Sequence, residues 1–240
     1  MKDSLRNNFP WFFLLPVMGF LFFGLYFLLL DQAQLILQIN SFHTPFWDKF
    51  YALFTNLGDG FMMLPILIFF IFRKPNFVTP LIYVALLQLV MIVLSKNFLW
   101  PNTLRPWGYF HENLPNTLIH LADGVKVHSH DTFPSGHTLT IFSVMYLLCL
   151  LYKFRPFSQV LLFLLALWVG FSRIYLFQHF FIDVYFGAFF GVLLAHCAIL
   201  LWRITINSSS MDLKILSFFQ NYRRKIFQQI RELAYKLNIF

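Results

Sequence analysis

Apolar and polar positions alternate in long blocks along this chain, and six blocks are mostly apolar over about 18 residues or more. They lie at roughly 11 to 30, 55 to 72, 79 to 99, 135 to 152, 157 to 177 and 180 to 202. Because an α-helix rises about 1.5 Å per residue, each block is long enough to cross a hydrocarbon core of about 30 Å. The pattern predicts an all-α polytopic membrane protein, a bundle of six transmembrane helices.

The first two blocks have alternative interpretations. The first could be the apolar part of a signal peptide, but it is longer than such a segment, and residues 31–34 (DQAQ) form a poor cleavage site. We therefore expect a retained first helix. The second block is less regular, because Asn56, Gly58, Asp59 and Gly60 interrupt its start and leave a short apolar remainder.

Composition and charge agree with a membrane location. Apolar residues make up 59% of the chain, charged residues make up 12%, and the mean hydropathy is +0.66, which excludes an ordinary soluble globule. If six spans place both termini on one side, that side holds Lys2, Arg6, Arg73, Lys74, Lys153, Arg155, Arg203, Lys214, Arg223, Arg224, Lys225, Arg231 and Lys236. The other side holds Lys49, Lys96, Arg105, Lys126 and Arg173. The richer side is expected to be cytoplasmic, so the net charge of +8 reports topology and does not imply nucleic-acid binding.

The C-terminal segment differs from the rest of the chain. After a membrane domain at residues 1–203, residues 204–240 contain a polar linker at 207–210 and then a repeating apolar stripe. The stripe consists of Ile215, Phe219, Tyr222, Ile226, Ile230, Leu233 and Leu237. These three- and four-residue steps predict a basic amphipathic helix. It could rest on the anionic cytoplasmic leaflet, pair with its copy in a dimer, or pack under the bundle.

The longest polar stretch of the membrane domain, roughly residues 100 to 134, contains four histidines at 111, 120, 128 and 130. Loops of this length carry function or are disordered. His128, His130 and Asp131 resemble part of a metal site, but no matching set of ligands occurs elsewhere in the sequence. No metal and no cofactor are expected.

The sequence Pro134-Ser135-Gly136-His137 begins the fourth apolar block. The first backbone N–H groups of a helix are unpaired and its N-terminus is positive, so a phosphate can bind there, and glycine allows close approach. In the alternative interpretation Ser135 only caps the helix and His137 rests at the membrane interface.

Three ionisable residues lie where the fifth and sixth blocks meet. Arg173 ends the fifth, and His179 and Asp183 begin the sixth, four positions apart and so on one helical face. A carboxylate that accepts one imidazole N–H leaves the other ring nitrogen free to attack phosphorus. The alternative is a buried pair that only joins two helices, although ionisable residues within a membrane usually have a function.

Two more cations precede these groups. Lys96 ends the third block, and Arg105 follows after a short loop. With Arg173 they could neutralise the oxygens of a phosphate, Arg105 with a planar fork and Lys96 as a point charge. In the alternative interpretation each of these three side chains, considered by itself, only extends along the apolar region and places its charge at the membrane–water interface.

Gly187 and Gly191 form a Gly-x-x-x-Gly step in the sixth block, which allows another helix to approach closely. That helix is expected within the same bundle, and a dimer face is the alternative.

The three polar blocks together resemble the signature of the type-2 phosphatidic acid phosphatase and haloperoxidase superfamily. Pro134-Ser135-Gly136-His137 matches the second motif, and Ser172-Arg173 with His179 and Asp183 matches the third. The first motif departs from the usual spacing, since eight residues instead of six separate Lys96 from Arg105-Pro106. The resemblance covers about residues 50–203.

This resemblance implies a metal-independent enzyme with its site on the outer face of the membrane. His179 would form a phosphohistidine, Asp183 would orient His179, and His137 would protonate the leaving oxygen and then activate water. The phosphate would be held by Lys96, Arg105, Ser135, Gly136 and Arg173. Positioned cations supply the charge stabilisation that phosphoryl transfer requires.

The six apolar blocks favour the lipid phosphatase branch over the soluble, vanadate-binding haloperoxidases. A lipid phosphate in the bilayer is the expected substrate, with undecaprenyl diphosphate first, then lipid A and the phosphates of phosphatidate or phosphatidylglycerol phosphate. The expected location is a bacterial inner membrane, with the site on its periplasmic face. Two alternatives stay open: a lipid phosphotransferase using the same intermediate, and a non-catalytic lipid-binding protein.

Overall fold

The computed structural model describes residues 9–208, 221–222, 224–226, 228–229 and 231–232, and they form helices and connecting turns. The helices are α2 (Trp11–Leu28), α3 (Gln32–Asn40), α4 (Pro45–Phe54), α5 (Met63–Arg73), α6 (Val78–Leu94), α7 (Pro106–Asn113), α8 (Gly136–Leu151), α9 (Pro156–Tyr175) and α10 (Phe181–Ser208). Short helical turns are η1 (Thr55–Gly58), η2 (Gly60–Met62), η3 (Pro75–Phe77) and the π-helical η4 (Ser95–Leu99).

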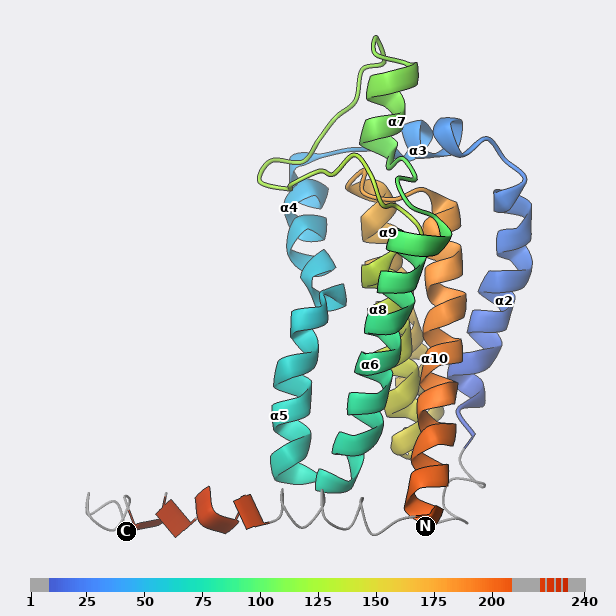
Figure 1. The fold of residues 1–240 in the computed structure, drawn as a ribbon. Coiled ribbons are helices and arrows are strands. Elements are labelled where there is room, and N and C mark those ends of the chain that lie inside the picture. Colours follow the sequence, from blue (N-terminus) through green and yellow to red (C-terminus); the bar gives the residue numbers. More distant parts are fainter. Residues whose placement is uncertain (1–8, 209–220, 223, 227, 230, 233–240) are drawn as a thin grey trace.

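The long helices stand side by side in one bundle (Figure 1). α2, α6 and α9 run toward the end that carries α3, α7 and the segment 100–134, whereas α5, α8 and α10 run away from it. α8 is buried on nearly all sides, with Phe142, Tyr146 and Leu147 fully enclosed. An apolar helix without a polar face belongs in the centre of a bundle, and α8 takes that place.

Four of the described helices are long and apolar enough to cross a membrane: Trp11–Leu28, Pro75–Leu99, Pro156–Tyr175 and Phe181–Thr205. A bent pair, Pro45–Gly58 with Gly60–Arg73, makes five if it counts as one span, and α8 is shorter. The all-α polytopic class is confirmed, with four or five candidate spans among the described residues by length and hydropathy. The expected number of six stays a prediction.

The second predicted span begins earlier than its apolar run. α4 starts at Pro45, where the Thr44 side chain accepts the N–H of Trp47, and the helical path bends by 60° before α5. Asp59 caps the turn after the break by accepting the N–H of Phe61 at 3.0 Å. The polar and glycine residues 56–60 therefore mark a bend inside this segment, not its start.

The Gly-x-x-x-Gly step packs inside the bundle, as expected. A Cβ on Gly191 would lie 2.7 Å from the carbonyl oxygen of Leu139, and one on Gly187 would lie 3.0 Å from that of Ser135. α10 therefore lies against α8 at a distance that larger side chains would prevent, and it continues past Arg203 to Ser208.

The predicted amphipathic tail falls mostly outside the described residues. Of its apolar stripe, Tyr222 and Ile226 are described, whereas Ile215, Phe219, Ile230, Leu233 and Leu237 are not. The tail and its cytoplasmic contacts stay a prediction.

Candidate active site

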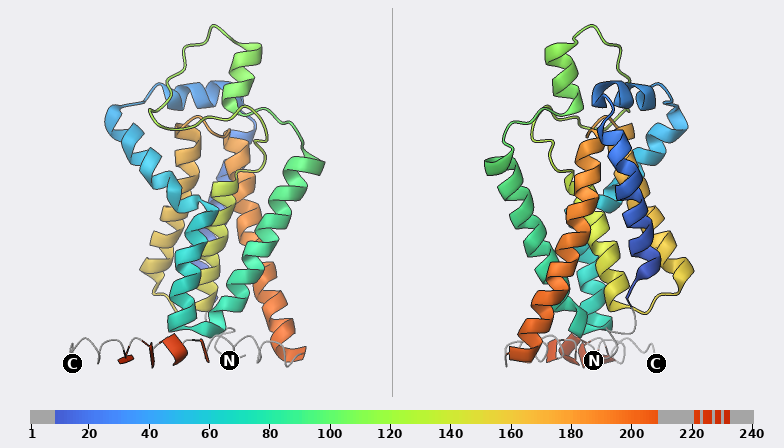
Figure 2. Two further views of the ribbon diagram at one scale, coloured as in Figure 1. Left: turned by 60° about the vertical axis from the view of Figure 1, so that its left-hand side comes forward. Right: turned by 90° about the vertical axis from the view of Figure 1, so that its right-hand side faces the viewer.

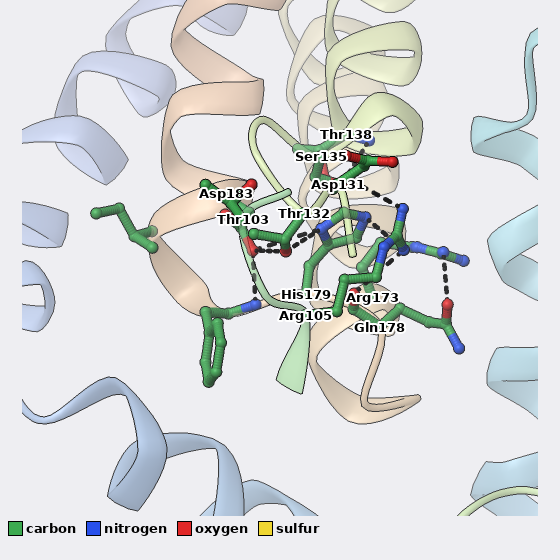
Figure 3. A network of polar contacts seen from close by, with 12 residues as sticks. Thr103, Arg105, Asp131, Thr132, Ser135, Thr138, Arg173, Gln178, His179 and Asp183 are labelled. Atoms are coloured by element: carbon green, nitrogen blue, oxygen red, sulfur yellow. Dashed lines mark hydrogen bonds and ion pairs between the residues drawn. The ribbon is translucent and has the colours of Figure 1, made fainter. Parts of the chain in front are cut away.

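Four parts of the chain meet at one end of the bundle, as the views in Figures 1 and 2 show. They are the last turn of α9, the turn before α10, the first turn of α8 and the polar segment that follows α6. Figure 3 shows the side chains that they bring together: Arg105, Thr132, Ser135, Arg173, Gln178, His179 and Asp183. Residues up to 78 positions apart in the sequence (Arg105 and Asp183) thus share one polar cluster.

Backbone hydrogen bonds fix the polar segment over the helix ends. The N–H of Arg105 donates to the carbonyl of Ser129 (2.8 Å), and the N–H of Thr132 donates to that of Thr103 (3.2 Å). The N–H of Ser135 donates to the carbonyl of Asp183 (3.1 Å), which joins the starts of α8 and α10. The loop is therefore held at both ends beside the cluster.

The sequence predicts that His179 begins the sixth helix. In the structure His179 instead lies in the turn 176–180, before the first residue of α10. Its contact with Asp183 forms because Asp183 turns back over the start of the helix, where its carboxylate accepts the N–H of Phe180 at 2.9 Å. Nδ1 of His179 lies 3.4 Å from Oδ2 of Asp183. Both side chains are almost fully buried. The two side chains of the predicted pair therefore lie in contact, and the carboxylate of Asp183 also caps the start of α10.

Thr132 completes this pair. Its Oγ1 lies 3.2 Å from Nδ1 of His179 and donates to Oδ2 of Asp183 at 2.5 Å. Both contacts place acceptor oxygens beside Nδ1, so the proton of a neutral His179 is on that nitrogen.

The other ring nitrogen faces a cation. Nη1 of Arg105 lies 3.4 Å from Nε2 of His179. A guanidinium can only donate, so Nε2 presents its lone pair. Arg105 is itself held by the carbonyl oxygens of His130 (2.9 Å), Asp131 (3.3 Å) and Gln178 (3.3 Å). The lone pair on Nε2 of His179 thus points to the positive charge of Arg105.

Burial lowers the pKa of His179 well below its usual value near 6.5. The nearby charges of Arg105, Arg173, Lys96 and His137 lower this pKa further. All four predicted basic groups therefore lie within electrostatic range of His179, and the imidazole stays neutral at physiological pH.

One nitrogen of the Arg173 guanidinium, Nε, lacks a hydrogen-bond partner among the described residues. Its Nη1 donates to Thr55 (2.9 Å) and its Nη2 to the side-chain oxygen of Gln178 (3.4 Å), while the buried Nε makes no hydrogen bond within the described residues. A buried, unpaired donor on a cation calls for an anionic ligand.

The start of α8 carries the remaining predicted residues. Ser135 is fully buried and accepts the N–H of Thr138 (3.5 Å), so it does cap the helix. Gly136 and His137 line a cavity beside α5 and α6. Lys96 is half-buried on the π-helical turn η4. No hydrogen bond joins His137 or Lys96 to His179 in the described structure.

Residues 76–207 match the PAP2 superfamily. The chain belongs to this superfamily. It is 28% identical over 165 residues to a lipid A 4'-phosphatase of Bacteroides thetaiotaomicron, which covers 67% of this chain and 72% of the relative. The crystal structure of Aquifex aeolicus LpxE matches with a TM-score of 0.58 and 29% identity, over 69% of this chain and 93% of that one. A phosphatidylglycerolphosphate phosphatase of Bacillus subtilis matches with a TM-score of 0.49 and 22% identity, over 77% and 92%.

Membership in the PAP2 superfamily confirms the predicted family and class of enzyme. The protein is an integral membrane lipid phosphate phosphatase of the PAP2 type, a class of phosphomonoesterases that works without a metal ion. Its substrate is a lipid phosphate of the membrane.

The sequence motifs missed three side chains of this PAP2 site. Thr132 joins His179 to Asp183, whereas Gln178 and Thr55 hold Arg173. Gln178 directly precedes His179 of the third motif, and this position is a weak indication that it belongs to the site. Thr132 and Thr55 lie on segments whose place beside the site depends on how the loop and α4 pack.

The histidine-rich part of the loop forms no metal centre in the part of the chain that the structure describes, where no group of three or more His, Cys, Asp or Glu could hold an ion. His130 instead lies 4.0 Å from Glu112.

Proposed function

We propose that this PAP2 phosphatase removes a phosphate from lipid A or a similarly phosphorylated membrane lipid through a phosphohistidine on His179. The observation that carries the chemistry is the state of His179. Its Nδ1 is beside Thr132 and Asp183, its Nε2 lone pair faces Arg105, and Arg173 keeps an unpaired donor nearby. This arrangement suits an attack on a phosphate that two guanidinium groups hold.

In the first step Nε2 of His179 attacks phosphorus. The N–P bond forms while the P–O bond to the lipid breaks, and His137 gives a proton to the leaving oxygen. Asp183 stabilises the positive charge that develops on the ring. In the second step water attacks the phosphohistidine, His137 takes its proton, and the N–P bond breaks to release inorganic phosphate.

Lys96, Arg105 and Arg173 are proposed to bind the phosphate oxygens, together with the backbone N–H groups at Ser135 and Gly136. The start of α8 offers these groups beside a fully buried Ser135. The positive end of the helix adds to the three cations. No metal or cofactor enters either step.

The substrate proposal rests on the relative in Bacteroides thetaiotaomicron, whose name is lipid A 4'-phosphatase. This similarity moves lipid A ahead of undecaprenyl diphosphate, which the sequence alone ranked first. Undecaprenyl diphosphate, phosphatidate and phosphatidylglycerol phosphate are the alternatives to be tested beside it.

We further propose six passes across a bacterial inner membrane, with the bent α4–α5 pair and α8 each counted as one. The site would then face the periplasm, and residues 1–203 would form the membrane domain. The basic tail, 204–240, would lie on the cytoplasmic side. The charge distribution in the sequence supports this orientation.

The test is phosphate release by the detergent-purified protein, with chelator present, from each of the four lipids. We expect release from lipid A by the wild type and none by His179→Ala. Arg155→Lys changes an exposed residue far from the site and controls for losses of activity during mutagenesis and purification. Release from another lipid alone would move the substrate to that lipid. If labelled phosphate passes to a second lipid and none is released, the protein is a phosphotransferase.

A further inference from the structure

The carboxylate of Asp48 on α4 accepts hydrogen bonds from two other segments of the chain. The hydroxyl of Tyr175, the last residue of α9, donates to Oδ1 at 2.8 Å. Nε2 of His120, in the polar segment 100–134, lies 2.7 Å from Oδ2, so this ring nitrogen carries a proton. The side chain of Asp48 is 13% exposed. A carboxylate withdrawn from water needs such donors, and here they come from α9 and from the polar segment.

Both donors are positioned by contacts that do not involve Asp48. The side-chain amide of Asn40 donates to the carbonyl oxygen of His120 (2.8 Å) and accepts the N–H of the same residue (2.9 Å). The ring of His120 also stacks on that of His43, with centroids 3.7 Å apart. Tyr175 belongs to the last turn of a 20-residue helix. The two donors therefore determine where Asp48 lies, and with it α4.

α4 makes few other contacts that fix its position. Tyr51 is the one buried residue among its ten, all of which the structure describes. Phe46 and Leu53 are 67% and 75% exposed, and the helical path bends by 60° before α5. A helix with little buried surface depends on its few contacts for a fixed position. The hydrogen bonds to Asp48 therefore contribute much of what places α4 beside α9.

The residue after α4 connects this helix to the active site. Thr55 follows Asp48 by seven positions, about two helical turns, so the two side chains lie on the same side of the helical path. Oγ1 of Thr55 accepts a hydrogen bond from Nη1 of Arg173 at 2.9 Å. The segment thus contacts α9 twice, at Tyr175 and at Arg173. A shift of α4 at Asp48 would move the oxygen that holds Arg173.

The second contact of the Arg173 guanidinium leads back to His120. Nη2 of Arg173 donates to the side-chain oxygen of Gln178 at 3.4 Å, as Figure 3 shows. Nε2 of Gln178 donates in turn to the carbonyl oxygen of Lys126 at 3.1 Å, six positions after His120. Both Nη1 and Nη2 are therefore held by segments that meet where Asp48 contacts His120. The contacts form a closed ring through Arg173, Thr55, Asp48, His120, Lys126 and Gln178.

From this ring of contacts we infer that Asp48 is a positioning residue for the guanidinium of Arg173 and acts through α4 and Thr55. The inference rests on the proposed function, in which Arg173 binds an oxygen of the phosphate. Thr55 and Gln178 occupy two nitrogens of the guanidinium, and Nε, unpaired within the described residues, stays available to the phosphate. Displacement of such a group by about 1 Å can cost about 10²-fold in rate. The orientation that Asp48 fixes is therefore a condition for binding and catalysis.

The test measures the binding of orthovanadate, a phosphate analogue, to the detergent-purified full chain by calorimetry, which requires no turnover. Asp48→Leu has a side chain of similar size but accepts no hydrogen bond. We expect its dissociation constant for orthovanadate to be about tenfold higher than that of the wild type. Asp48→Asn should recover most of the affinity, because its oxygen accepts from Tyr175 and its N–H group donates to Nε2 of His120 in the other neutral tautomer.

The matched control is Tyr51→Phe. The hydroxyl that it lacks is the acceptor for Nε1 of Trp168 at 3.0 Å, a hydrogen bond between the same two helices that is not part of the ring of contacts. We expect Tyr51→Phe to bind orthovanadate within about twofold of the wild type. A loss as large as in Asp48→Leu would mean that any weakened contact between α4 and α9 lowers the affinity, and it would overturn the inference.

A double-mutant cycle decides whether Asp48 acts through Arg173. In the Arg173→Lys background, Asp48→Leu should change the dissociation constant by less than about twofold, because the guanidinium that Asp48 positions is already gone. In the Thr132→Val background the loss should stay about tenfold, because Thr132 contacts His179 and Asp183 instead. Equal losses in both backgrounds would show a general effect on the fold and overturn the inference, as would wild-type affinity in Asp48→Leu.

His120→Phe breaks the ring of contacts at a second place if Asp48→Leu does not fold. It keeps an aromatic ring beside His43 and the backbone bonds to Asn40 but removes the donor to Asp48. The same cycle then applies, with the same outcomes for and against.

The inference and the proposed function fail separately. Loss of orthovanadate affinity in Arg173→Lys but not in Asp48→Leu would leave Arg173 in the phosphate site and remove the role of Asp48. Coupling between Asp48 and Arg173 without phosphate release from any lipid would instead keep the positioning role and overturn the proposed hydrolysis.

Discussion

Oγ1 of Thr132 lies 3.2 Å from Nδ1 of His179, closer to this nitrogen than the carboxylate of Asp183 at 3.4 Å. The same hydroxyl donates to Asp183 at 2.5 Å. The side chain of Thr132 therefore fixes both members of the pair from the loop that precedes α8. In the proposed mechanism Thr132 acts through His179, as a positioning residue.

Two replacements of Thr132 should distinguish the contribution of its hydroxyl group to catalysis from that of its side-chain packing. Thr132→Val keeps the branched side chain but removes the hydroxyl that joins Nδ1 to Asp183, so we expect kcat to fall about a hundredfold with little change in KM. Thr132→Ser restores the hydroxyl and should recover most of kcat. Phosphate release measured against lipid concentration gives both parameters. A Ser variant as impaired as the Val variant would show that packing, not hydrogen bonding, is what Thr132 provides.

Arg173 tests the need for a planar fork. Arg173→Lys keeps the charge but loses the unpaired Nε donor and cannot hold both Thr55 and Gln178. We expect kcat/KM to fall about 10²- to 10³-fold, the usual loss for a transition-state donor. Competitive inhibition by orthovanadate should weaken in parallel. The control is Arg155→Lys, the same change at an exposed position. Normal vanadate inhibition in Arg173→Lys would remove this residue from the phosphate site.

The sequence predicts the polar motifs better than the membrane segments. His179 and Asp183 meet because their spacing is local, and the proline and serine before Gly136 do begin a helix. Hydropathy recognises continuous apolar runs, so it missed α4, whose first turns carry Asp48 and Lys49. The start signal was nevertheless present, because Thr44-Pro45 is a favourable helix beginning.

Other features depend on tertiary structure. Asp31 caps α3 by accepting the N–H groups of Ala33 and Gln34, but α3 is short and partly polar, so periodicity alone does not reveal it. Thr132 reaches His179 only because backbone bonds hold its loop against residues 103–105. No pattern within the loop specifies that contact.

The low pKa of His179 predicts an unusual pH dependence. Its folded-state pKa lies well below 6.5 because of burial and the cations around it, so the neutral nucleophile persists as the pH falls through 6.5. An ordinary histidine would lose activity about tenfold per pH unit below its pKa. We expect single-turnover formation of phosphohistidine to be retained at pH 5 to 6, about one unit below the ordinary pKa.

Arg105→Gln provides the comparison for this pH profile. Among the cations, Arg105 lowers the pKa of His179 most, and its Nη1 lies 3.4 Å from Nε2 of His179. Its neutral replacement should raise that pKa, so the single-turnover rate should begin to fall at a higher pH than in the wild type. The maximal rate should also be lower, because Arg105 is proposed to bind the phosphate. If the single-turnover rate fell at the same acidic pH in the two proteins, a group other than His179 would determine the pH dependence.

The contact between Gly191 and Leu139 links stability to the site. A methyl group on Gly191 would lie 2.7 Å from a backbone oxygen and 2.9 Å from Cβ of Phe142, and neither atom can move unless the helices shift. Gly191→Ala should therefore destabilise the fold by about 1–3 kcal/mol. Gly19→Ala is the matched control, since nothing lies within 4 Å of its added methyl group. There the better helix propensity of alanine should leave stability equal or raise it by up to about 1 kcal/mol.

Thermal unfolding in detergent checks this pair of variants. We expect a lower midpoint for Gly191→Ala and an unchanged or higher one for Gly19→Ala. Because α10 also carries Asp183, whose carbonyl accepts the N–H of Ser135, separation of α8 from α10 should lower kcat as well. A Gly191→Ala protein with the midpoint and activity of Gly19→Ala would contradict the close α8–α10 packing, and with it the mutual placement of the starts of both helices.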